Sequence, residues 1–194
     1  MDTTVLKIIF LIGIVSSSII RFPHSREIRQ NTIVDDRKTT QENSLLFLVF
    51  LGMFILPMVY VLTPWLNFAN YVLPIWANIA GILTFSIALW LFWKSHHDLG
   101  QNWSPTLQVR EGHGLITDGI YQIIRHPMYT SIWLWAMAQA LLLANWIAGP
   151  SGVIAFGTLY FLRVGNEEKM MIEQFGDQYQ IYMQKTKRLL PYLF

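Results

Sequence analysis

The stretch IWANIAGILTFSIALWLFW, residues 75–93, decides the fold class because it contains no Asp, Glu, Lys or Arg. A helix that crosses about 30 Å of hydrocarbon needs roughly 20 predominantly apolar residues, and this stretch is close to that length. It ends in Trp90, Phe92 and Trp93, and Lys94 follows directly. Aromatic and then basic residues are typical of a helix that leaves the bilayer at its polar interface. The stretch therefore predicts a transmembrane helix.

Two stretches earlier in the chain have the same apolar character. Residues 44–63 carry no charged side chain, and residues 5–20 carry only Lys7, whose ammonium group can extend to the interface from near the helix end. A signal peptide is the alternative for the first stretch, but the basic n-region and the small-residue cleavage site are poorly formed. We expect three transmembrane helices within residues 1–93, with an interfacial loop at 64–74.

The uncharged run 127–162 predicts a helical hairpin. It is interrupted by the sequence GPSG at residues 149–152, which is a strong turn signal. Each arm is only marginally long enough to cross the bilayer, so we expect two short helices that pack closely. Beyond the hairpin, apolar and aromatic residues at helical spacing predict a C-terminal amphipathic helix. These residues are Met171, Ile172, Phe175, Tyr179, Tyr182 and Met183.

Composition favours a single membrane domain over residues 1–194 and argues against several soluble classes. Hydrophobic residues make up 53% of the chain and charged residues 13%, whereas soluble domains average about 25% charged residues. The net charge of +2 comes from short basic clusters, so we expect no nucleic-acid partner. A chain without cysteine has no disulfides, zinc–thiolate sites or thiol nucleophiles. Adjacent His96 and His97 point in different directions on a helix, so we expect no metal site either.

The distribution of Lys and Arg predicts the orientation in the membrane. Loops 64–74 and 145–152 contain neither residue, whereas segments 94–126 and 163–194 contain several. Because basic residues concentrate in cytoplasmic loops, we expect a multi-pass protein with about five crossings, the N-terminus outside and the C-terminus in the cytoplasm. The two basic segments flank the hairpin, so a site formed between them would be cytoplasmic. The loop between the first two helices agrees, since it holds Arg21, Arg26, Arg29, Arg37 and Lys38.

A polar cluster precedes the hairpin and has two interpretations. It consists of Gly119, Tyr121, Arg125, His126, Pro127 and Tyr129. As a membrane-entry turn, it would place tyrosines at the interface and interrupt the helix at His126, because the residue before a proline disfavours helix. As a site, the same turn would open backbone groups around His126 that can hold polar atoms of a cofactor. The pattern of these residues leaves both interpretations open.

Arg163 and Glu167 also have two interpretations. Their spacing of four residues places them on one face of a helix. On an exposed helix this ion pair would contribute only about 0.3 to 0.5 kcal/mol and would merely mark the cytoplasmic border. If the helix end is buried, an arginine at membrane depth is a functional-site candidate. Its guanidinium would suit a carboxylate, because it can donate two parallel hydrogen bonds.

Taken together, these elements resemble a known family. The chain contains, in order, Gly119-x-Tyr121, Arg125-His126-Pro127-x-Tyr129, Arg163, Glu167-Glu168, Phe175-Gly176-x-x-Tyr179 and Leu189-Leu190-Pro191. This pattern resembles the isoprenylcysteine carboxyl methyltransferase family, in particular its short, prokaryotic-type membrane members. The resemblance covers residues 101–194, and it implies that residues 94–194 form a catalytic region with cytoplasmic cofactor-binding segments. The three N-terminal helices do not contribute to it.

The resemblance implies transfer of a methyl group from S-adenosyl-L-methionine to the carboxylate of a prenylated cysteine or a similar lipid-linked carboxylate. The implied catalytic residues are Arg163, which would face the substrate carboxylate, and Glu167. Thr130, Ser131 and Trp133 are candidate substrate-binding residues, and Ser131 stands where many relatives have glycine. The implied cofactor contacts are Gln108, His113, Gly114, Leu115, Ile116, Tyr121, His126, Pro127, Met128, Tyr129 and Glu167.

The expected partners are a lipid-modified cysteine that enters from the bilayer and the membrane lipids themselves. A carboxylate is already ionised near neutral pH, so its methylation requires alignment and desolvation but no general base. Three alternatives stay open. They are a methyltransferase for phospholipid amines, a membrane reductase that uses NADPH, and a non-enzymatic scaffold in which Arg163 and Glu167 form only a border ion pair.

Overall fold

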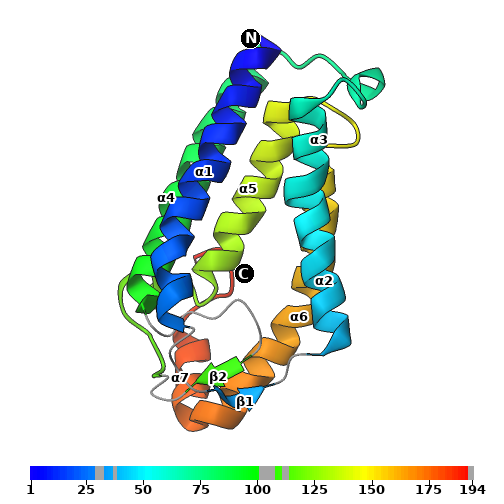
Figure 1. Ribbon diagram of the computed structural model, residues 1–194. Coiled ribbons are helices and arrows are strands. Elements are labelled where there is room, and N and C mark those ends of the chain that lie inside the picture. Colours follow the sequence, from blue (N-terminus) through cyan, green and yellow to red (C-terminus); the bar gives the residue numbers. More distant parts are fainter. Residues whose placement is uncertain (29–32, 37–38, 101–107, 111–113, 192–194) are drawn as a thin grey trace.

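The computed structural model shows a bundle of long helices that run roughly side by side (Figure 1). It describes the backbone of residues 1–28, 33–36, 39–100, 108–110 and 114–191, and the side chains of residues 1–24, 39–100 and 114–191. The helices are α1 (Thr3–Ile28), α2 (Thr40–Phe50), α3 (Leu56–Leu62), α4 (Ile75–Leu99), α5 (Pro127–Leu143), α6 (Ser151–Phe175) and α7 (Asp177–Lys185). Three shorter helical segments are η1 (Leu51–Ile55), η2 (Asn67–Ala69) and η4 (Gly119–Gln122).

Within the described residues, three helical stretches are long and apolar enough to cross a membrane. They are Thr3–His24, Thr40–Leu62 and Ile75–Leu99, with mean hydropathies of 2.1, 2.7 and 1.8. Each of the three N-terminal stretches predicted from the sequence corresponds to one of these helical stretches, and α1 extends past the predicted end at residue 20. The fold class, an all-α integral membrane protein, is confirmed. Two short strands that the sequence did not predict, β1 (Ile33–Asp36) and β2 (Gln108–Arg110), pair antiparallel outside the bundle.

The second span is one continuous helical rod with a π-helical turn, η1, between α2 and α3. In this turn the amide of Leu56 bonds to the carbonyl of Leu51, and Pro57, one residue later, has no N–H to offer the carbonyl of Gly52. That carbonyl instead accepts hydrogen bonds from Gln139 Nε2 at 3.0 Å and Ser151 Oγ at 2.6 Å. The irregular turn therefore connects the second span to both arms of the hairpin.

The predicted hairpin is present, but its second arm does not end at residue 162. Helix α6 continues without interruption to Phe175, because no proline or helix-ending glycine occurs before Gly176. Gly176 has a φ of +54°, a conformation that glycine adopts without steric penalty, and α7 starts directly after it. The stripe expected on one C-terminal amphipathic helix is consequently divided between α6 and α7.

An aromatic cluster joins α1, α4 and α5 in the middle of the bundle. Phe10 and Phe85 stack with ring centroids 5.7 Å apart, and Trp135 meets Phe85 edge to face at 4.7 Å. Close backbone approach supports this packing, since a Cβ on Gly81 would come within 2.8 Å of the Leu141 Cβ. Aromatic pairs in such edge and stacked geometries add about 0.5 to 1.5 kcal/mol beyond their burial, so this cluster holds α4 and α5 in fixed register.

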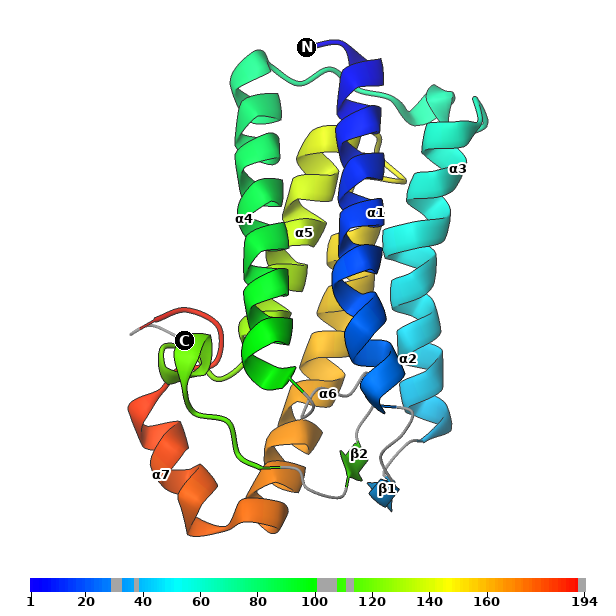
Figure 2. The same cartoon turned by 60° about the vertical axis from the view of Figure 1, so that its left-hand side comes forward.

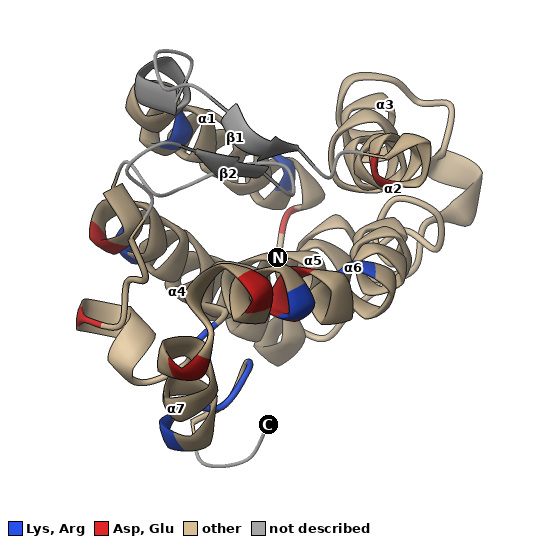
Figure 3. Cartoon of the chain, turned by 90° about the horizontal axis from the view of Figure 1, so that it is seen from below, with Lys and Arg blue, Asp and Glu red and all other residues tan. Residues whose placement is uncertain are grey.

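The two ends of the bundle differ in character. At one end the loops 64–74 and 145–152 meet, because Asn145 Nδ2 donates to the carbonyl of Leu66 at 2.7 Å and the amide of Tyr71 donates to the carbonyl of Ala144 at 2.9 Å. At the other end acidic and basic residues lie along the ends of α5, α6 and α7 (Figure 3). The two loops without Lys or Arg therefore share one end, and α7 lies beyond the opposite end (Figure 2). Which end faces the cytoplasm stays a prediction.

Candidate functional site

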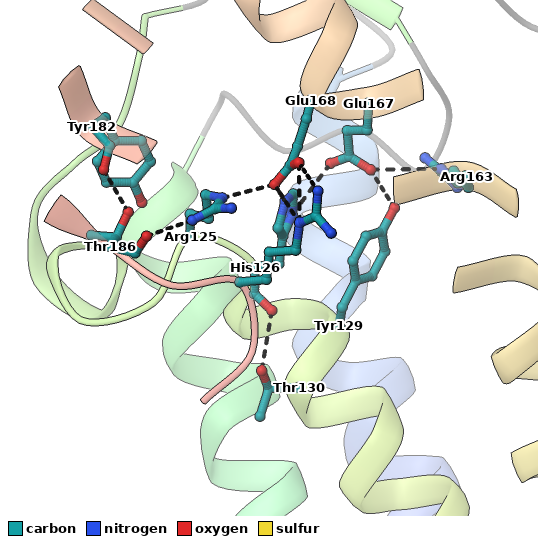
Figure 4. A network of polar contacts seen from close by, with 10 residues as sticks. Arg125, His126, Tyr129, Thr130, Arg163, Glu167, Glu168, Tyr182 and Thr186 are labelled. Carbon is teal, nitrogen blue, oxygen red and sulfur yellow. Dashed lines mark hydrogen bonds and ion pairs between the residues drawn. The ribbon is translucent and has the colours of Figure 1, made fainter. Parts of the chain in front are cut away.

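The candidate site is built around two consecutive carboxylates, Glu167 and Glu168, on the part of α6 that extends past the predicted end of the hairpin. Neighbouring residues on a helix point about 100° apart, so the two carboxylates face different partners (Figure 4). Glu167 lies toward Tyr129 and Arg163, whereas Glu168 lies toward Arg125 and the C-terminal tail. The two carboxylates of this short segment therefore contact two different sets of residues.

Glu168 is the buried centre of an ion-pair network, with 5% of its side chain exposed. Arg188 binds it as a fork, with Nε 3.0 Å from Oε1 and Nη2 2.5 Å from Oε2, and Arg125 Nε lies 2.7 Å from Oε1. His126 Nε2 lies 3.2 Å from the same oxygen. Burial alone would raise the pKa of Glu168, but the hydrogen bonds from His126, Arg188 and Arg125 outweigh it and hold that pKa well below its usual range.

The C-terminal tail, which is the chain that follows α7, lies along the turn that precedes α5 and is hydrogen-bonded to it. The amides of Arg125 and His126 donate to the carbonyls of Lys187 and Arg188 at 2.9 and 3.0 Å. Thr130 Oγ1 donates to the carbonyl of Leu189 at 2.9 Å. These bonds add to the Glu168 network, so the tail is an integral wall of the site.

Arg163 is buried, with 8% of its surface exposed, although it carries a permanent positive charge. Its Nε lies 3.8 Å from Glu167 Oε2, and its Nη2 lies 3.6 Å from Glu42 Oε1. Tyr129 donates its hydroxyl hydrogen to the same oxygen of Glu167. A buried guanidinium between two carboxylates differs from an exposed ion pair at a helix border, so the border interpretation of Arg163 and Glu167 does not hold.

The His–Pro turn brings the predicted polar cluster to this network. His126 has φ −124° and ψ 57°, outside the helical region, and Pro127 starts α5, where its missing N–H costs nothing. His126 Nδ1 lies 4.0 Å from Glu167 Oε1, so the ring stands between the two carboxylates. Upstream, Tyr182 donates its hydroxyl to the carbonyl of Tyr121 at 2.6 Å, which attaches α7 to η4.

A second anchor positions the chain before η4. Asp98, at the end of α4, accepts the amide hydrogen of Ile120 at 2.8 Å and pairs with Lys94 at 2.7 Å. Gly119 has a φ of +59°, and a Cβ there would lie 2.2 Å from the Asp98 carboxylate. Glycine is required at this position for both reasons. The contact with Asp98 therefore holds the start of η4, and with it the segment that leads to the His–Pro turn, against the end of α4.

The structure brings together five of the residues predicted from the sequence, and the others lie in the segments around them or outside the described part of the chain. Gly114, Leu115 and Ile116 lie in the segment that leads to η4, and Met128 is in the first turn of α5. His113 and the side chain of Gln108 lie outside the described part of the chain. The five residues that meet are His126, Pro127, Tyr129, Arg163 and Glu167, whereas Tyr121 contacts Tyr182 on α7.

The three candidate substrate-binding residues have defined surroundings. Thr130 holds the tail through Leu189, and Ser131 donates its hydroxyl to the carbonyl of Met128 at 2.7 Å. Trp133 packs edge to face against Phe156 at 5.4 Å, in the apolar cluster between α5 and α6.

Sequence reasoning missed Glu42 as a site residue and gave no role to Glu168 and Arg188. Glu42 is only 4% exposed and comes from the first turn of α2. A signal was available, because Thr39 and Glu42 have the spacing of a capping box, and Thr39 does accept the amide hydrogen of Glu42 at 3.1 Å. The carboxylate of Glu42, however, lies beside Arg163, which local pattern cannot reveal.

The fold and this site define a helical integral membrane protein with a buried charged site at one end of the bundle. Residues 80–173 match the model of the isoprenylcysteine carboxyl methyltransferase (ICMT) family. The resemblance inferred from the sequence is thereby confirmed, and the family is one of carboxyl O-methyltransferases, whose reaction requires a methyl donor.

Curated relatives match the same region of the chain. A protein-S-isoprenylcysteine O-methyltransferase from Schizosaccharomyces pombe is 31% identical over 94 residues, which cover 47% of this chain and 40% of the relative. The Dictyostelium discoideum protein of that name is 33% identical over 98 residues, covering 47% and 40%. The Homo sapiens protein is 27% identical over 120 residues, covering 61% and 42%. The matched part of the chain thus spans less than half the length of each of these relatives.

A solved structure supports the fold. It is described as the eukaryotic intramembrane Ras methyltransferase ICMT (isoprenylcysteine carboxyl methyltransferase) without a monobody, and it aligns with a TM-score of 0.55 at 23% identity. The alignment covers 82% of this chain and 55% of that one. The likeness therefore extends beyond residues 80–173 into the N-terminal helices.

Proposed function

We propose that this chain transfers a methyl group from S-adenosyl-L-methionine to the carboxylate of a prenylated cysteine or a similar lipid-linked carboxylate. The observation that carries the proposal is the buried guanidinium of Arg163 in a membrane protein whose residues 80–173 match the isoprenylcysteine carboxyl methyltransferase family. A buried cation at the end of a helical bundle suits an anionic substrate. A neutral amine that accepts the methyl group would not itself pair with this guanidinium.

The proposed cofactor site uses the residues around the His–Pro turn. Glu167 is 27% exposed at its side chain, in contrast to the enclosed Glu168, so a ligand can reach its carboxylate. An accessible carboxylate beside a histidine fits a cofactor that carries an ammonium group and a sulfonium. When bound, this cofactor supplies a methyl group whose bond to sulfur breaks as the bond to the carboxylate oxygen forms.

The full set of proposed cofactor contacts includes residues from both sides of this turn. Those before it are Gln108, His113, Gly114, Leu115, Ile116 and Tyr121, and those from the turn onward are His126, Pro127, Met128, Tyr129 and Glu167.

The role proposed for Arg163 is to orient the substrate carboxylate. That carboxylate is ionised near neutral pH, so no residue has to act as a general base. Alignment at about 3 to 3.5 Å from the methyl carbon can supply much of the rate enhancement. An excessively strong contact with Arg163 would stabilise the ground state as well and would gain nothing in rate.

The position of the site supports a membrane substrate. The charged network lies at one end of the bundle (Figure 3), where a polar cofactor can enter from water. The neighbouring surface of the helices is apolar, with Phe161 and Leu162 on α6 exposed, and a lipid tail can occupy the bilayer beside it. We propose Thr130, Ser131 and Trp133 on α5 as residues along the lipid path.

Cofactor choice tests the proposal without knowledge of the natural substrate. Binding of S-adenosylhomocysteine and of NADPH to the detergent-purified protein should be measured by calorimetry. We expect saturable binding of S-adenosylhomocysteine only, weakened in Glu167→Ala. Binding of NADPH instead would indicate a reductase, and binding of neither by folded protein would favour a scaffold.

A further inference from the structure

Arg163 has a second carboxylate partner that comes from outside the family-matched region. Glu42 lies near the start of α2, and residues 80–173 are the part that matches the family model. Its Oε1 is 3.6 Å from Arg163 Nη2, slightly closer than the 3.8 Å between Arg163 Nε and Glu167 Oε2. Helix α2 reaches α6 through Leu45, Leu46 and Val49, which pack against the apolar cluster of α5 and α6.

The two carboxylates beside Arg163 differ in their other partners and in their burial. Glu167 also accepts the hydroxyl hydrogen of Tyr129, and its side chain is 27% exposed. Glu42 is 4% exposed at its side chain, so its negative charge is enclosed together with the positive charge of Arg163. Burial of one charge without the other is unfavourable, which explains why a carboxylate stands at this position.

The separation between Glu42 and Arg163 suits an exchangeable partner. Charge-assisted hydrogen bonds between a guanidinium and a carboxylate are about 2.7 to 2.9 Å long, whereas the Glu42 contact is 3.6 Å. The Arg188–Glu168 fork, at 2.5 and 3.0 Å, is the contrasting tight pair in the same molecule. Glu42 therefore balances the charge of Arg163, but this contact is longer than the two hydrogen bonds of the Arg188–Glu168 pair.

We propose that Glu42 is a positioning residue that competes with the substrate carboxylate for Arg163, an inference that rests on the proposed function. Before substrate binds, Glu42 keeps the guanidinium paired. A carboxylate substrate displaces it, because both groups offer the same two-oxygen anion to one cation. The methyl ester product is neutral and cannot compete, so Glu42 pairs with Arg163 again and the ester is released.

This competition has a charge-specific consequence. Removing the negative charge of Glu42 strengthens binding of the acid, because its competitor is gone, and leaves binding of the neutral ester unchanged. A purely structural role of Glu42 would affect acid and ester alike. The ratio of the two affinities therefore reports the competition separately from any general change in the site.

The test compares an S-prenylated N-acylcysteine with its methyl ester on the detergent-purified full chain. Turnover of the acid by the wild type is measured first, because its absence overturns the proposed function itself. Dissociation constants of acid and ester are then measured for wild type, Glu42→Gln and Glu42→Asp. Asp2→Asn is the control, since Asp2 is another carboxylate near a helix start, where it accepts the amide hydrogen of Thr4 at 2.8 Å, but it lies at the opposite end of the bundle.

We expect Glu42→Gln to bind the acid about fivefold more tightly, which corresponds to about 1 kcal/mol, with the ester unchanged. Glu42→Asp keeps the charge and should stay closer to the wild type. Two outcomes overturn the proposed competition, provided that the wild type is active. The first is an equal change in the affinities for acid and ester, and the second is weaker binding of the acid by Glu42→Gln. Structures of the wild type with each compound give a measurement that needs no variant: the Glu42–Arg163 separation should lengthen with the acid only, and an unchanged separation overturns the inference.

Discussion

At the residue scale, neighbouring side chains in this site have separate tasks. Glu168 is enclosed by Arg125, Arg188 and His126 and holds the tail, whereas Glu167 is partly exposed beside Arg163. A single position along α6 thus separates a structural carboxylate from one that we propose to bind a ligand. Substitutions at the two positions should have different consequences.

Arg163→Ala and Glu167→Ala should separate turnover from cofactor binding. Removing the guanidinium should lower kcat/KM by roughly 30-fold or more, because the loss of one partner of a buried charged contact costs about 2 to 5 kcal/mol. Binding of S-adenosylhomocysteine should stay close to that of the wild type. Glu167→Ala should weaken that binding about tenfold, or about 1.4 kcal/mol. Calorimetry and a methyl-transfer assay check both, and equal loss of both properties in both folded variants would contradict the assignment.

Glu168→Gln should destabilise the protein in a pH-dependent way. The folded-state pKa of Glu168 lies well below its usual range because hydrogen bonds from His126, Arg188 and Arg125 outweigh burial. Its contribution is therefore fully present above the unfolded pKa of about 4.3 and is lost as the pH falls toward the folded value.

We expect Glu168→Gln to lose about 3 kcal/mol at pH 7, since the buried Arg125 and the half-buried Arg188 lose their anion. The difference from the wild type should shrink below about pH 4. Thermal unfolding in detergent at pH 7, 5 and 3 measures this, with the exposed carboxylate of Glu173 on the same helix replaced in a Glu173→Gln control. A difference that grows on acidification would contradict the assignment.

At the element scale, the π-helical turn η1 determines how closely the second span approaches the hairpin. Its freed Gly52 carbonyl bonds to Gln139 and Ser151, and the absence of a side chain at Gly52 permits the approach. A Cβ there would lie 2.6 Å from the carbonyl oxygen of Ser151 and 2.7 Å from the Ala155 Cβ. Since α2 carries Glu42, this contact also positions the site.

Gly52→Ala should lower the thermal unfolding midpoint, because backbone atoms of α6 must move away at a cost of about 1 to 3 kcal/mol. Gly165→Ala is the matched control on α6. A Cβ there meets nothing within 4 Å among the described residues, so helix propensity should raise stability by about 0.5 to 1 kcal/mol. Opposite shifts of the two midpoints would agree with the packing, and equal shifts would contradict it.

At the scale of the whole molecule, the arrangement of the ends restricts the orientation. The two loops without Lys or Arg meet at one end through Asn145 and Leu66, and the tail and the charged site lie at the other. Because both loops are at the same end, they should lie on one side of the membrane and the charged site on the other. The positive-inside rule predicts that the charged end faces the cytoplasm.

The chain has no cysteine, so single introduced thiols report this orientation directly. Phe68→Cys, at a position 80% exposed in the loop end, should react with a membrane-impermeant maleimide in intact cells. Gln184→Cys, exposed on α7, should react only after the membrane is permeabilised. The reverse pattern would show that the charged end faces outside.

Hydropathy and breaker residues, which are local, determined the three N-terminal spans, the turn of the hairpin and the His–Pro start of α5. The resemblance likewise predicted roles for Arg163 and Glu167, which lie only four residues apart in the sequence. Tertiary structure alone decided that the carbonyl of Gly52 bonds to the hairpin and that Glu168 is enclosed by Arg188. It also decided that Glu42 pairs with Arg163. Each of these contacts joins segments that are far apart in the sequence, and burial of a charge against its partner leaves no local pattern.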